Sequence, residues 1–168
     1  DGITVRGCEI RDIGATGIYL DGNNCAYENN LIHHIGLIQA SGVGLWALGT
    51  KLTIRHNEMH DLPYCGMVTE RDDHLIEDNL LYRVMQQLQD GGAIYTGDNK
   101  GIIIRGNFVH DIVGAGARHA YYIDERGHDS LVENNVAVNV AWPWHNHIGR
   151  NNVIRNNIAI AEGDLKIT

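Results

Sequence analysis

A four-residue motif recurs seven times along the chain, and it limits the possible fold more than any other feature. Its copies read VRGC, YENN, IRHN, IEDN, IRGN, VENN and IRNN, and their last residues are Cys8, Asn30, Asn57, Asn79, Asn107, Asn135 and Asn157. The intervals between these residues are 22, 27, 22, 28, 28 and 22. A base period of 22 residues is too short for repeats of paired helices, which need about 33 or more. We therefore expect about seven turns, each built from two or three short strands.

Apolar residues alternate with polar ones around every copy of the motif. The residue three before the last letter is Val, Tyr or Ile, and the residue two after it is Ile, Met, Leu, Val or Ala. Alternation with a period of two is typical of a strand with one buried face. The repeat predicts strands that each pair in parallel with their equivalents one turn later.

The second letter of the motif changes sign at every copy. It is, in order, Arg6, Glu28, Arg55, Glu77, Arg105, Glu133 and Arg155. Stacked turns about 4.8 Å apart would place each charge between two opposite ones, which is worth about 0.2 to 1 kcal/mol for each exposed pair. The same stacking would align the asparagines, for which we expect left-handed backbone angles and hydrogen bonds between the amides of adjacent turns.

These repeats resemble the right-handed parallel β-helix of the pectin-lyase-like kind, and they cover essentially the whole chain. The predicted fold class is therefore all-β: a right-handed, single-stranded parallel β-helix of about seven turns of about 22 residues, forming one domain over residues 1–168. The handedness is implied by the resemblance. Residues 1–3 enter directly on a turn and residues 161–168 stop within one, which would leave open strand edges. We expect a fragment of a longer chain, with flanking turns, a capping domain or a partner covering its ends.

Charge and composition exclude several functions. The net charge of −8 disfavours sequence-independent binding to nucleic acid. The three cysteines, Cys8, Cys25 and Cys65, are too few and too unevenly spaced for a disulfide framework or a zinc site. No apolar run approaches the length of about 18 residues that suggests a membrane span, and no signal peptide is visible in this chain.

The second strand of each turn carries the first functional signal. The segments 17–21, 44–48, 66–70, 93–97 and 120–125 are predicted to point Tyr19, Trp46, Val68, Tyr95 and Tyr122 outward, followed on the same face by Asp21, Leu48, Glu70, Gly97 and Asp124. An exposed row of aromatic rings beside acids suits a sugar, because rings pack on its apolar face and carboxylates bind its hydroxyls. The insertions 36–43, 85–91 and 113–119 all precede this strand and would wall a groove.

Two acids of this groove form the predicted catalytic pair. The segments DGGAIYTG at 90–97 and YYIDE at 121–125 are similar to segments of β-helical glycoside hydrolases, in which acids from neighbouring turns serve as the catalytic pair. The resemblance implies that Asp90 and Asp124 are catalytic. Because adjacent turns lie about 4.8 Å apart, we expect their carboxylates to approach the separations of roughly 5 to 9.5 Å that glycoside hydrolysis uses. Asp90 is explained equally well as a turn cap before two glycines, and Glu125 competes with Asp124 for the second role.

Other polar and aromatic residues are predicted to contact the substrate. They are Glu70, Tyr95, Tyr122, Trp46, His119, Glu125 and His145, and His119 or His145 could assist an acid. Three histidines, His33, His60 and His110, share one column with Arg11 and Tyr82, which indicates a repeated turn feature. We expect no metal site and no cofactor.

The leading hypothesis is a carbohydrate-active domain that hydrolyses the glycosidic bonds of a neutral or weakly charged polysaccharide. One alternative is a polysaccharide lyase or epimerase acting on uronates, which would need Ca²⁺ or the cations Arg118, Arg126 and Lys100 to neutralise the substrate carboxylate. The other is a non-catalytic glycan-binding or structural module. The expected partner is a polysaccharide or oligosaccharide, with neither nucleic acid nor membrane, and the expected location is secreted, periplasmic or at the cell surface.

Overall fold

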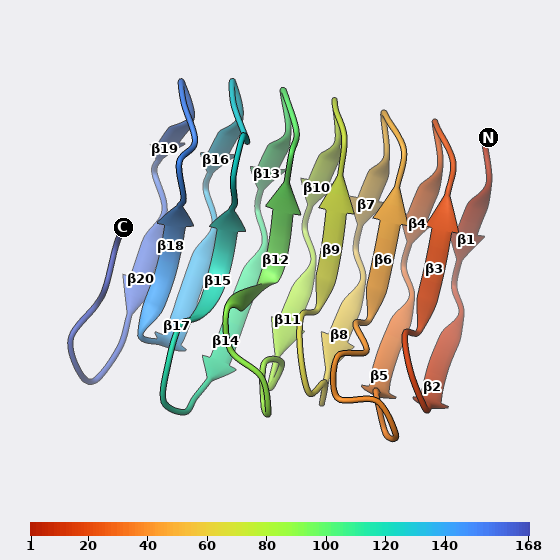
Figure 1. Ribbon diagram of the computed structural model, residues 1–168, viewed down its shortest axis with the longest axis horizontal. Coiled ribbons are helices and arrows are strands. Elements are labelled where there is room, and N and C mark those ends of the chain that lie inside the picture. Colours follow the sequence, from red (N-terminus) through yellow and green to blue (C-terminus); the bar gives the residue numbers. More distant parts are fainter.

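The computed structural model describes residues 1–168 as three parallel sheets wound into one continuous coil (Figure 1). Sheet A contains β1 (Thr4–Arg6), β4 (Ala26–Glu28), β7 (Thr53–Arg55), β10 (Leu75–Glu77), β13 (Ile103–Arg105), β16 (Leu131–Glu133) and β19 (Val153–Arg155). Sheet B contains β2 (Glu9–Ile13), β5 (Leu31–Ile35), β8 (Glu58–His60), β11 (Leu80–Tyr82), β14 (Phe108–Ile112), β17 (Val136–Val140) and β20 (Ile158–Ile160). Sheet C contains β3 (Ile18–Asp21), β6 (Leu45–Leu48), β9 (Met67–Glu70), β12 (Gly91–Gly97), β15 (Arg118–Ile123) and β18 (Trp142–Asn146). The predicted parallel β-helix is confirmed, and each turn supplies one strand to each sheet up to β20. After β20 the last residues return to sheet C, where Ile167 forms an isolated parallel bridge with Trp144 of β18.

The register of sheet A confirms the alternating column of charges. Glu28 pairs with Arg6 on one side and with Arg55 on the other. Its two carboxylate oxygens accept hydrogen bonds from these guanidinium groups at 2.8 and 2.9 Å. Glu77 and Arg105 repeat the contact at 2.8 Å. The alternating charges of this column therefore predicted correctly which turns are neighbours.

The asparagine column forms a continuous ladder of side-chain amides inside the coil. Each amide nitrogen donates to the amide oxygen of the next turn at 2.9 to 3.0 Å, from Asn30 through Asn57, Asn79, Asn107 and Asn135 to Asn157. The prediction that these residues themselves adopt left-handed backbone angles is wrong. The preceding residue does so, as at His56 (φ 56°) and Asp78 (φ 53°). This residue bends the chain, and the asparagine that follows turns inward, where its amide bonds backbone groups that the bend leaves without strand partners.

Stacked apolar side chains fill the coil between the three sheets. From sheet C, Leu45, Met67, Ile94 and Tyr121 are each at most 1% exposed, in agreement with their predicted inward direction. Ile54, Ile76 and Ile104 form an equivalent column from sheet A. Burying one such side chain contributes about 1.5 to 3 kcal/mol, several times the value of an exposed ion pair. The apolar columns therefore supply most of the stability.

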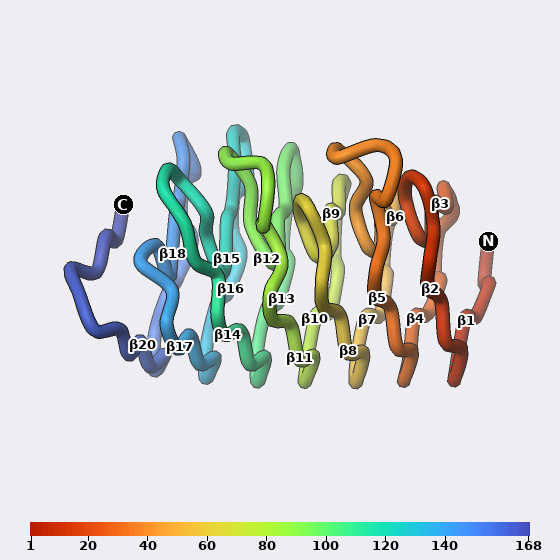
Figure 2. The backbone as a smooth tube through the Cα atoms, turned by 90° about the horizontal axis from the view of Figure 1, so that it is seen from below, coloured from red at the N-terminus to blue at the C-terminus, as the bar shows by residue number.

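The three insertions lie along one edge of the stack, where the chain passes from sheet B to sheet C (Figure 2). They connect β5 to β6, β11 to β12 and β14 to β15. This edge borders the entry to sheet C, so the insertions are placed as predicted. The structure contains no helix that could span a membrane.

The predicted histidine column is a stack of rings on the outer face of sheet B. His33, His60, Tyr82 and His110 follow one another at centroid distances of 4.8 to 4.9 Å, with their planes within 13° of parallel. This spacing is the distance between turns, so the column is the repeated feature that the sequence indicated.

Candidate functional site

The outer face of sheet C carries the predicted aromatic residues, but not as one uniformly exposed row. Tyr19 is 64% exposed and packs edge to face on Trp46, at 5.9 Å between ring centroids. Val68 then interrupts the aromatic column. Tyr122, which was predicted to be exposed, is only 4% exposed. His119 and His145, which were themselves predicted to contact substrate, pack against its ring.

Five aromatic rings gather on the C-terminal half of this face, and we call them the ring cluster: Tyr95, His119, Tyr122, His145 and His147. Tyr122 lies 5.0 Å from Tyr95, 4.6 Å from His119 and 4.5 Å from His145, measured between ring centroids. His119 and His145 stack at 4.7 Å, and His147 continues the stack at 5.5 Å. Four of the five were predicted to contact substrate, and they come from three successive turns: Tyr95 from β12, His119 and Tyr122 from β15, and His145 from β18. The fold brings all four together.

Asp124 lies at the edge of the ring cluster, directly after β15, and its side chain is 20% exposed. The Tyr95 hydroxyl donates to one of its oxygens, and His147 Nδ1 lies 2.9 Å from the other. Burial raises the pKa of Asp124, but the hydrogen bonds from Tyr95, His147, the Glu125 backbone and Tyr122 outweigh burial and lower it. Asp124 is therefore an ionised, firmly held carboxylate at neutral pH.

Gly97 lies beside the contact between Tyr95 and Asp124. It stands next to Asp124 in the adjacent turn, and a Cβ atom at this position would meet the Tyr95 ring at 3.7 Å and the Asp124 Cβ at 3.8 Å. A larger side chain would occupy the space that the Tyr95 ring crosses to reach the carboxylate. The glycine thus keeps the outer column open between Glu70 and Asp124.

Asp90 lies at the opposite end of sheet C from Asp124. It directly precedes β12, its φ of 59° is left-handed, and its carboxylate is exposed without a hydrogen-bond partner. Its backbone oxygen accepts a hydrogen bond of 2.8 Å from the Tyr64 hydroxyl. Asp90 thus also occupies the turn position that its glycine neighbours suggested. The expectation that the spacing of turns alone brings Asp90 and Asp124 to roughly 5 to 9.5 Å is wrong. The register places Asp90 beside Ala117 and Asp124 beside Gly97, so the length of the paired strands lies between the two acids.

A local bend in β15 breaks the alternation of its side chains at the ring cluster. Ala120 and Tyr121 are consecutive and both buried, so the alternation of side chains breaks between His119 and Tyr122, which both face outward. Burial is the main cause that lowers the pKa of His119, while the carboxylates of Asp90 and Asp124 both act to raise it. The negative charges of Asp90 and Asp124 therefore both affect His119, from opposite ends of the outer face of sheet C.

His119 is held as a neutral imidazole by this environment. Its Nδ1 donates to the backbone oxygen of Gly91 at 2.9 Å, and its buried Nε2 has no hydrogen-bond partner. Because burial lowers its pKa, Nε2 carries a free lone pair at neutral pH. A neutral histidine in this state can accept a proton.

The remaining predicted residues lie around the ring cluster. Glu70 ends β9, is exposed, and occupies the column of Asp124 two turns away, a backbone spacing of about 9.6 Å. Glu125 is exposed and reaches Asp124 through its backbone rather than its carboxylate. Trp46 is half-buried beside Tyr19, outside the cluster. Sequence reasoning missed His147 as a partner of Asp124, although it stands next to Asp124 in the repeat alignment.

The insertions line a hollow beside Asp90. Its volume is about 510 Å³, and its walls are Ser41, Tyr64, Gln87, Leu88, Gln89 and Arg118. Arg118 closes one side by donating from Nε to the Leu88 backbone oxygen at 3.0 Å. The insertions thus form the predicted wall at the Asp90 end.

Three parallel sheets wound into one coil define this molecule as a parallel β-helix. One outer face of the coil carries Asp124 beside the ring cluster. The chain belongs to the right-handed β-helix family: the family model described as a right handed beta helix region matches residues 1–164. No curated protein matches the chain.

Two solved structures show the same fold. A glycoside hydrolase superposes with a TM-score of 0.81 at 19% identity, covering 94% of this chain and 32% of the hydrolase. The A-module of mannuronan C-5 epimerase AlgE4 from Azotobacter vinelandii superposes with a TM-score of 0.54 at 13% identity, covering 99% of this chain and 56% of the module. The chain therefore spans about a third of one relative and just over half of the other. At these identities the likeness shows the fold alone.

Proposed function

We propose that this β-helix acts on a polysaccharide and hydrolyses its glycosidic bonds on the outer face of sheet C. Asp124 carries the proposal, because it is a largely buried carboxylate that hydrogen bonds keep ionised beside a cluster of aromatic rings. Both solved structures described above are named for carbohydrate-active enzymes. The names of these two proteins support a carbohydrate substrate, while Asp124 and its hydrogen bonds support hydrolysis.

Asp124 takes the role of base or nucleophile in this reaction. Glycoside hydrolysis needs one carboxylate that attacks the sugar or activates water, and one carboxylic acid that protonates the leaving oxygen. The lowered pKa of Asp124 suits the first role and disfavours the second. Tyr95 and His147 hold its two oxygens, so the carboxylate needs little reorganisation during the reaction.

Asp90 takes the role of the acid. Its carboxylate is free of hydrogen bonds and ion pairs, it borders the hollow formed by the insertions, and it acts on the same histidines as Asp124. Glu70 is the competing acid, because it shares the column of Asp124 at a backbone spacing of about 9.6 Å. Tyr19, Trp46 and Tyr95 offer ring faces along the coil axis on which successive sugars can pack.

A panel of polysaccharides assayed for new reducing ends tests this function. We expect Asp124→Asn to lower kcat on the active substrate by about 100-fold to 10,000-fold, with KM little changed. Asp90→Asn should cause a comparable loss, and Glu70→Gln a smaller one. Glu9→Gln is the control, because Glu9 is an exposed carboxylate on sheet B, away from this face, and the variant should keep wild-type activity. Full activity of Asp124→Asn would refute the site, and a loss in Glu70→Gln but not in Asp90→Asn would transfer the acid role.

A second candidate function is elimination or epimerisation at a uronate, and His119 is the observation that favours it. Its neutral Nε2 is an unpaired base, and proton removal beside a carboxylate needs such a base. No group of three or more His, Cys, Asp or Glu side chains is placed to hold a metal ion. Elimination would raise the ultraviolet absorbance of unsaturated products, epimerisation would change the sugar configuration seen by NMR, and His119→Ala would abolish either change.

A non-catalytic glycan-binding module is the remaining alternative. Binding of a polysaccharide without new reducing ends, unsaturated products or altered sugar configuration would support it. An extracellular or periplasmic location is part of the proposal, because polysaccharides of cell walls and matrices are found there. Fractionation of producing cells tests this location.

A further inference from the structure

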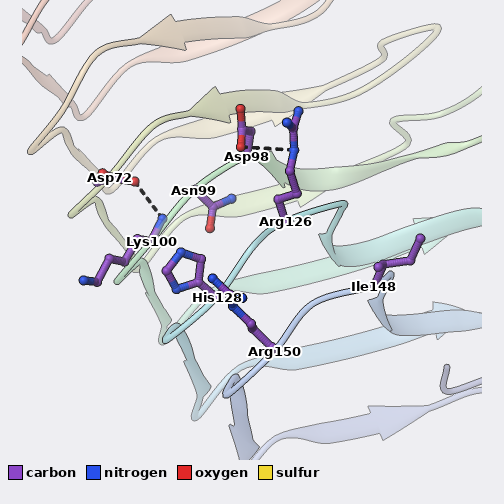
Figure 3. Close-up of a pocket in the computed structure, with 8 residues that line it drawn as sticks. All are labelled: Asp72, Asp98, Asn99, Lys100, Arg126, His128, Ile148 and Arg150. Atoms are coloured by element: carbon purple, nitrogen blue, oxygen red, sulfur yellow. Dashed lines mark hydrogen bonds and ion pairs between the residues drawn. The ribbon is translucent and has the colours of Figure 1, made fainter.

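A second hollow lies beyond the ring cluster, on the turns that lead from sheet C to sheet A. Its volume is about 470 Å³, and its walls are Asp72, Asp98, Asn99, Lys100, Arg126, His128, Ile148 and Arg150 (Figure 3). None of these residues belongs to the ring cluster or to the hollow beside Asp90. The hollow is therefore a separate feature of the surface.

Groups that can carry positive charge stack on three successive turns of this hollow. Lys100 pairs with His128, and His128 pairs with Arg150, through isolated parallel bridges. Neighbouring turns lie about 4.8 Å apart, so Lys100 and Arg150 stand on either side of the imidazole at about 9.6 Å of backbone separation. The charge column of sheet A alternates in sign at this spacing, and the column at this edge does not. Two cations of one sign with no anion between them cost free energy in the unbound protein.

The carboxylates around the hollow leave two of its cations unneutralised. Asp98 pairs with Arg126 at 3.3 Å, and the Asp72 carboxylate accepts the backbone N–H of Lys100 at 2.8 Å. The Lys100 ammonium and the Arg150 guanidinium form neither an ion pair nor a side-chain hydrogen bond. Asp129 lies beside His128, at 2.9 Å from its Nδ1, and does not contact either cation. In a chain with a net charge of −8, two unpaired cations line one hollow, and the Lys100 side chain extends away from Asn99 and Arg150 (Figure 3).

Asn99 is an independent sign that the hollow is built for a polar ligand. The residue is 2% exposed, and neither its amide nitrogen nor its amide oxygen has a hydrogen-bond partner. Buried polar groups are nearly always paired, so an amide with both atoms unpaired needs a reason. A ligand oxygen in the hollow would supply an acceptor for its nitrogen.

We propose that this hollow binds an oxyanion group carried by a saccharide, either a carboxylate or a sulfate ester. Arg150 presents a planar fork that matches two oxygens of such a group, Lys100 adds a point charge, and Asn99 donates from its amide. Binding at this site does not depend on hydrolysis at Asp124. Because the hollow follows sheet C on the same turns, it can hold an acidic substituent of a glycan while the neighbouring sugars lie on the ring cluster.

Calorimetric titration of the full chain tests the site with three oligosaccharides of equal length: one with uronate residues, one with sulfate esters and one neutral. We expect the uronate or the sulfated probe to bind about tenfold more tightly than the neutral probe, and the difference to shrink as salt is raised. The comparison of the two acidic probes identifies the oxyanion. Equal affinity of all three probes, or no binding by any of them, would overturn the proposal.

Variants locate the binding to this hollow. Arg150→Gln and Lys100→Gln should each weaken binding of the acidic probe about tenfold, without changing binding of the neutral probe. Lys51→Gln is the matched control, because Lys51 is an exposed and unpaired cation on an earlier turn of the same edge, outside the hollow. Unchanged affinity in both test variants, or an equal loss in the control, would refute the assignment.

Asn99→Leu separates a binding role from a structural one. Removal of an unpaired buried amide should leave the melting temperature equal or higher, while affinity for the acidic probe falls. A lower melting temperature with unchanged affinity would show that Asn99 serves the fold and would remove the second support of the proposal.

Discussion

Removal of one rung of the asparagine ladder should destabilise the whole coil. Asn107 is 1% exposed and lies in the middle of the ladder. Its amide nitrogen donates to the Ile76 backbone oxygen and to Asn135 Oδ1, both at 3.0 Å. Its amide oxygen accepts from the backbone and side-chain nitrogens of Asn79 at 3.0 and 2.9 Å. Asn107→Ala deletes these bonds and leaves the buried Asn79 N–H unpaired.

The magnitude follows from these contacts. Two lost hydrogen bonds of the amide nitrogen contribute about 1 kcal/mol each, and the unpaired N–H of Asn79 adds about 1 to 3 kcal/mol. The expected loss in the free energy of unfolding is therefore about 3 to 5 kcal/mol, a large fraction of the total of about 5 to 15 kcal/mol for a domain. For a chain of this length the loss corresponds to a decrease of about 6 to 20 °C in Tm.

Urea titration followed by circular dichroism measures this loss, with Asn157→Ala as the matched control. Asn157 is the last rung and is only partly buried, so water can replace its contacts, and we expect a loss of about 1 kcal/mol. A loss below about 1 kcal/mol in Asn107→Ala, or equal losses in the two variants, would show that the ladder is not a stabilising element.

Three further predictions follow from single contacts. Glu77→Arg places like charges on three successive turns of sheet A and should cost about 1 to 2 kcal/mol at low salt, and a cost that does not shrink with added salt would contradict the charge ladder. His147→Ala removes a hydrogen bond that lowers the pKa of Asp124, so carbon NMR should show this carboxyl titrating at a higher pH than in the wild type, and an unchanged titration would exclude the contact. Because the folded-state pKa of Asp124 is lowered, its stabilising contribution is present above the unfolded value of about 3.9 and is lost as pH falls through the folded value. Burial raises the pKa of Cys65 to about 12, so a thiol reagent at pH 8 should modify exposed Cys8 in the folded chain and reach Cys65 only after unfolding, and rapid modification of Cys65 would refute its burial.

The repeats made most of the fold predictable. In a parallel coil the neighbour of each residue is its equivalent one turn later. The repeats read from the sequence therefore predict which residues are in contact. The partners of Glu28, the amide ladder and the inward direction of Met67 and Ile94 all follow from this rule. The left-handed position was misplaced by one residue, since the asparagine pattern shows where a bend occurs but not which residue makes it.

The candidate site was predictable only in part. Asp124, Tyr95 and Tyr122 were found because they belong to repeated strands, and the insertions lie on the predicted edge. The burial of Tyr122 and the contact between His147 and Asp124 were not found, because they depend on a bend in sheet C and on side-chain directions in non-repeating segments. Asp90 was placed on the correct turn, but its distance across the sheet could not be derived from the spacing of turns.

The sequence by itself determined which segments are neighbours, because residues at equivalent positions of successive repeats are in contact in a parallel coil. Only the tertiary structure decided how side chains from different columns meet: an ionised Asp124 held by Tyr95 and His147, and two unpaired cations, Lys100 and Arg150, around one hollow. The physical reason is that contacts along a column are set by the strand spacing, whereas contacts between columns depend on bends and packing that no repeat encodes.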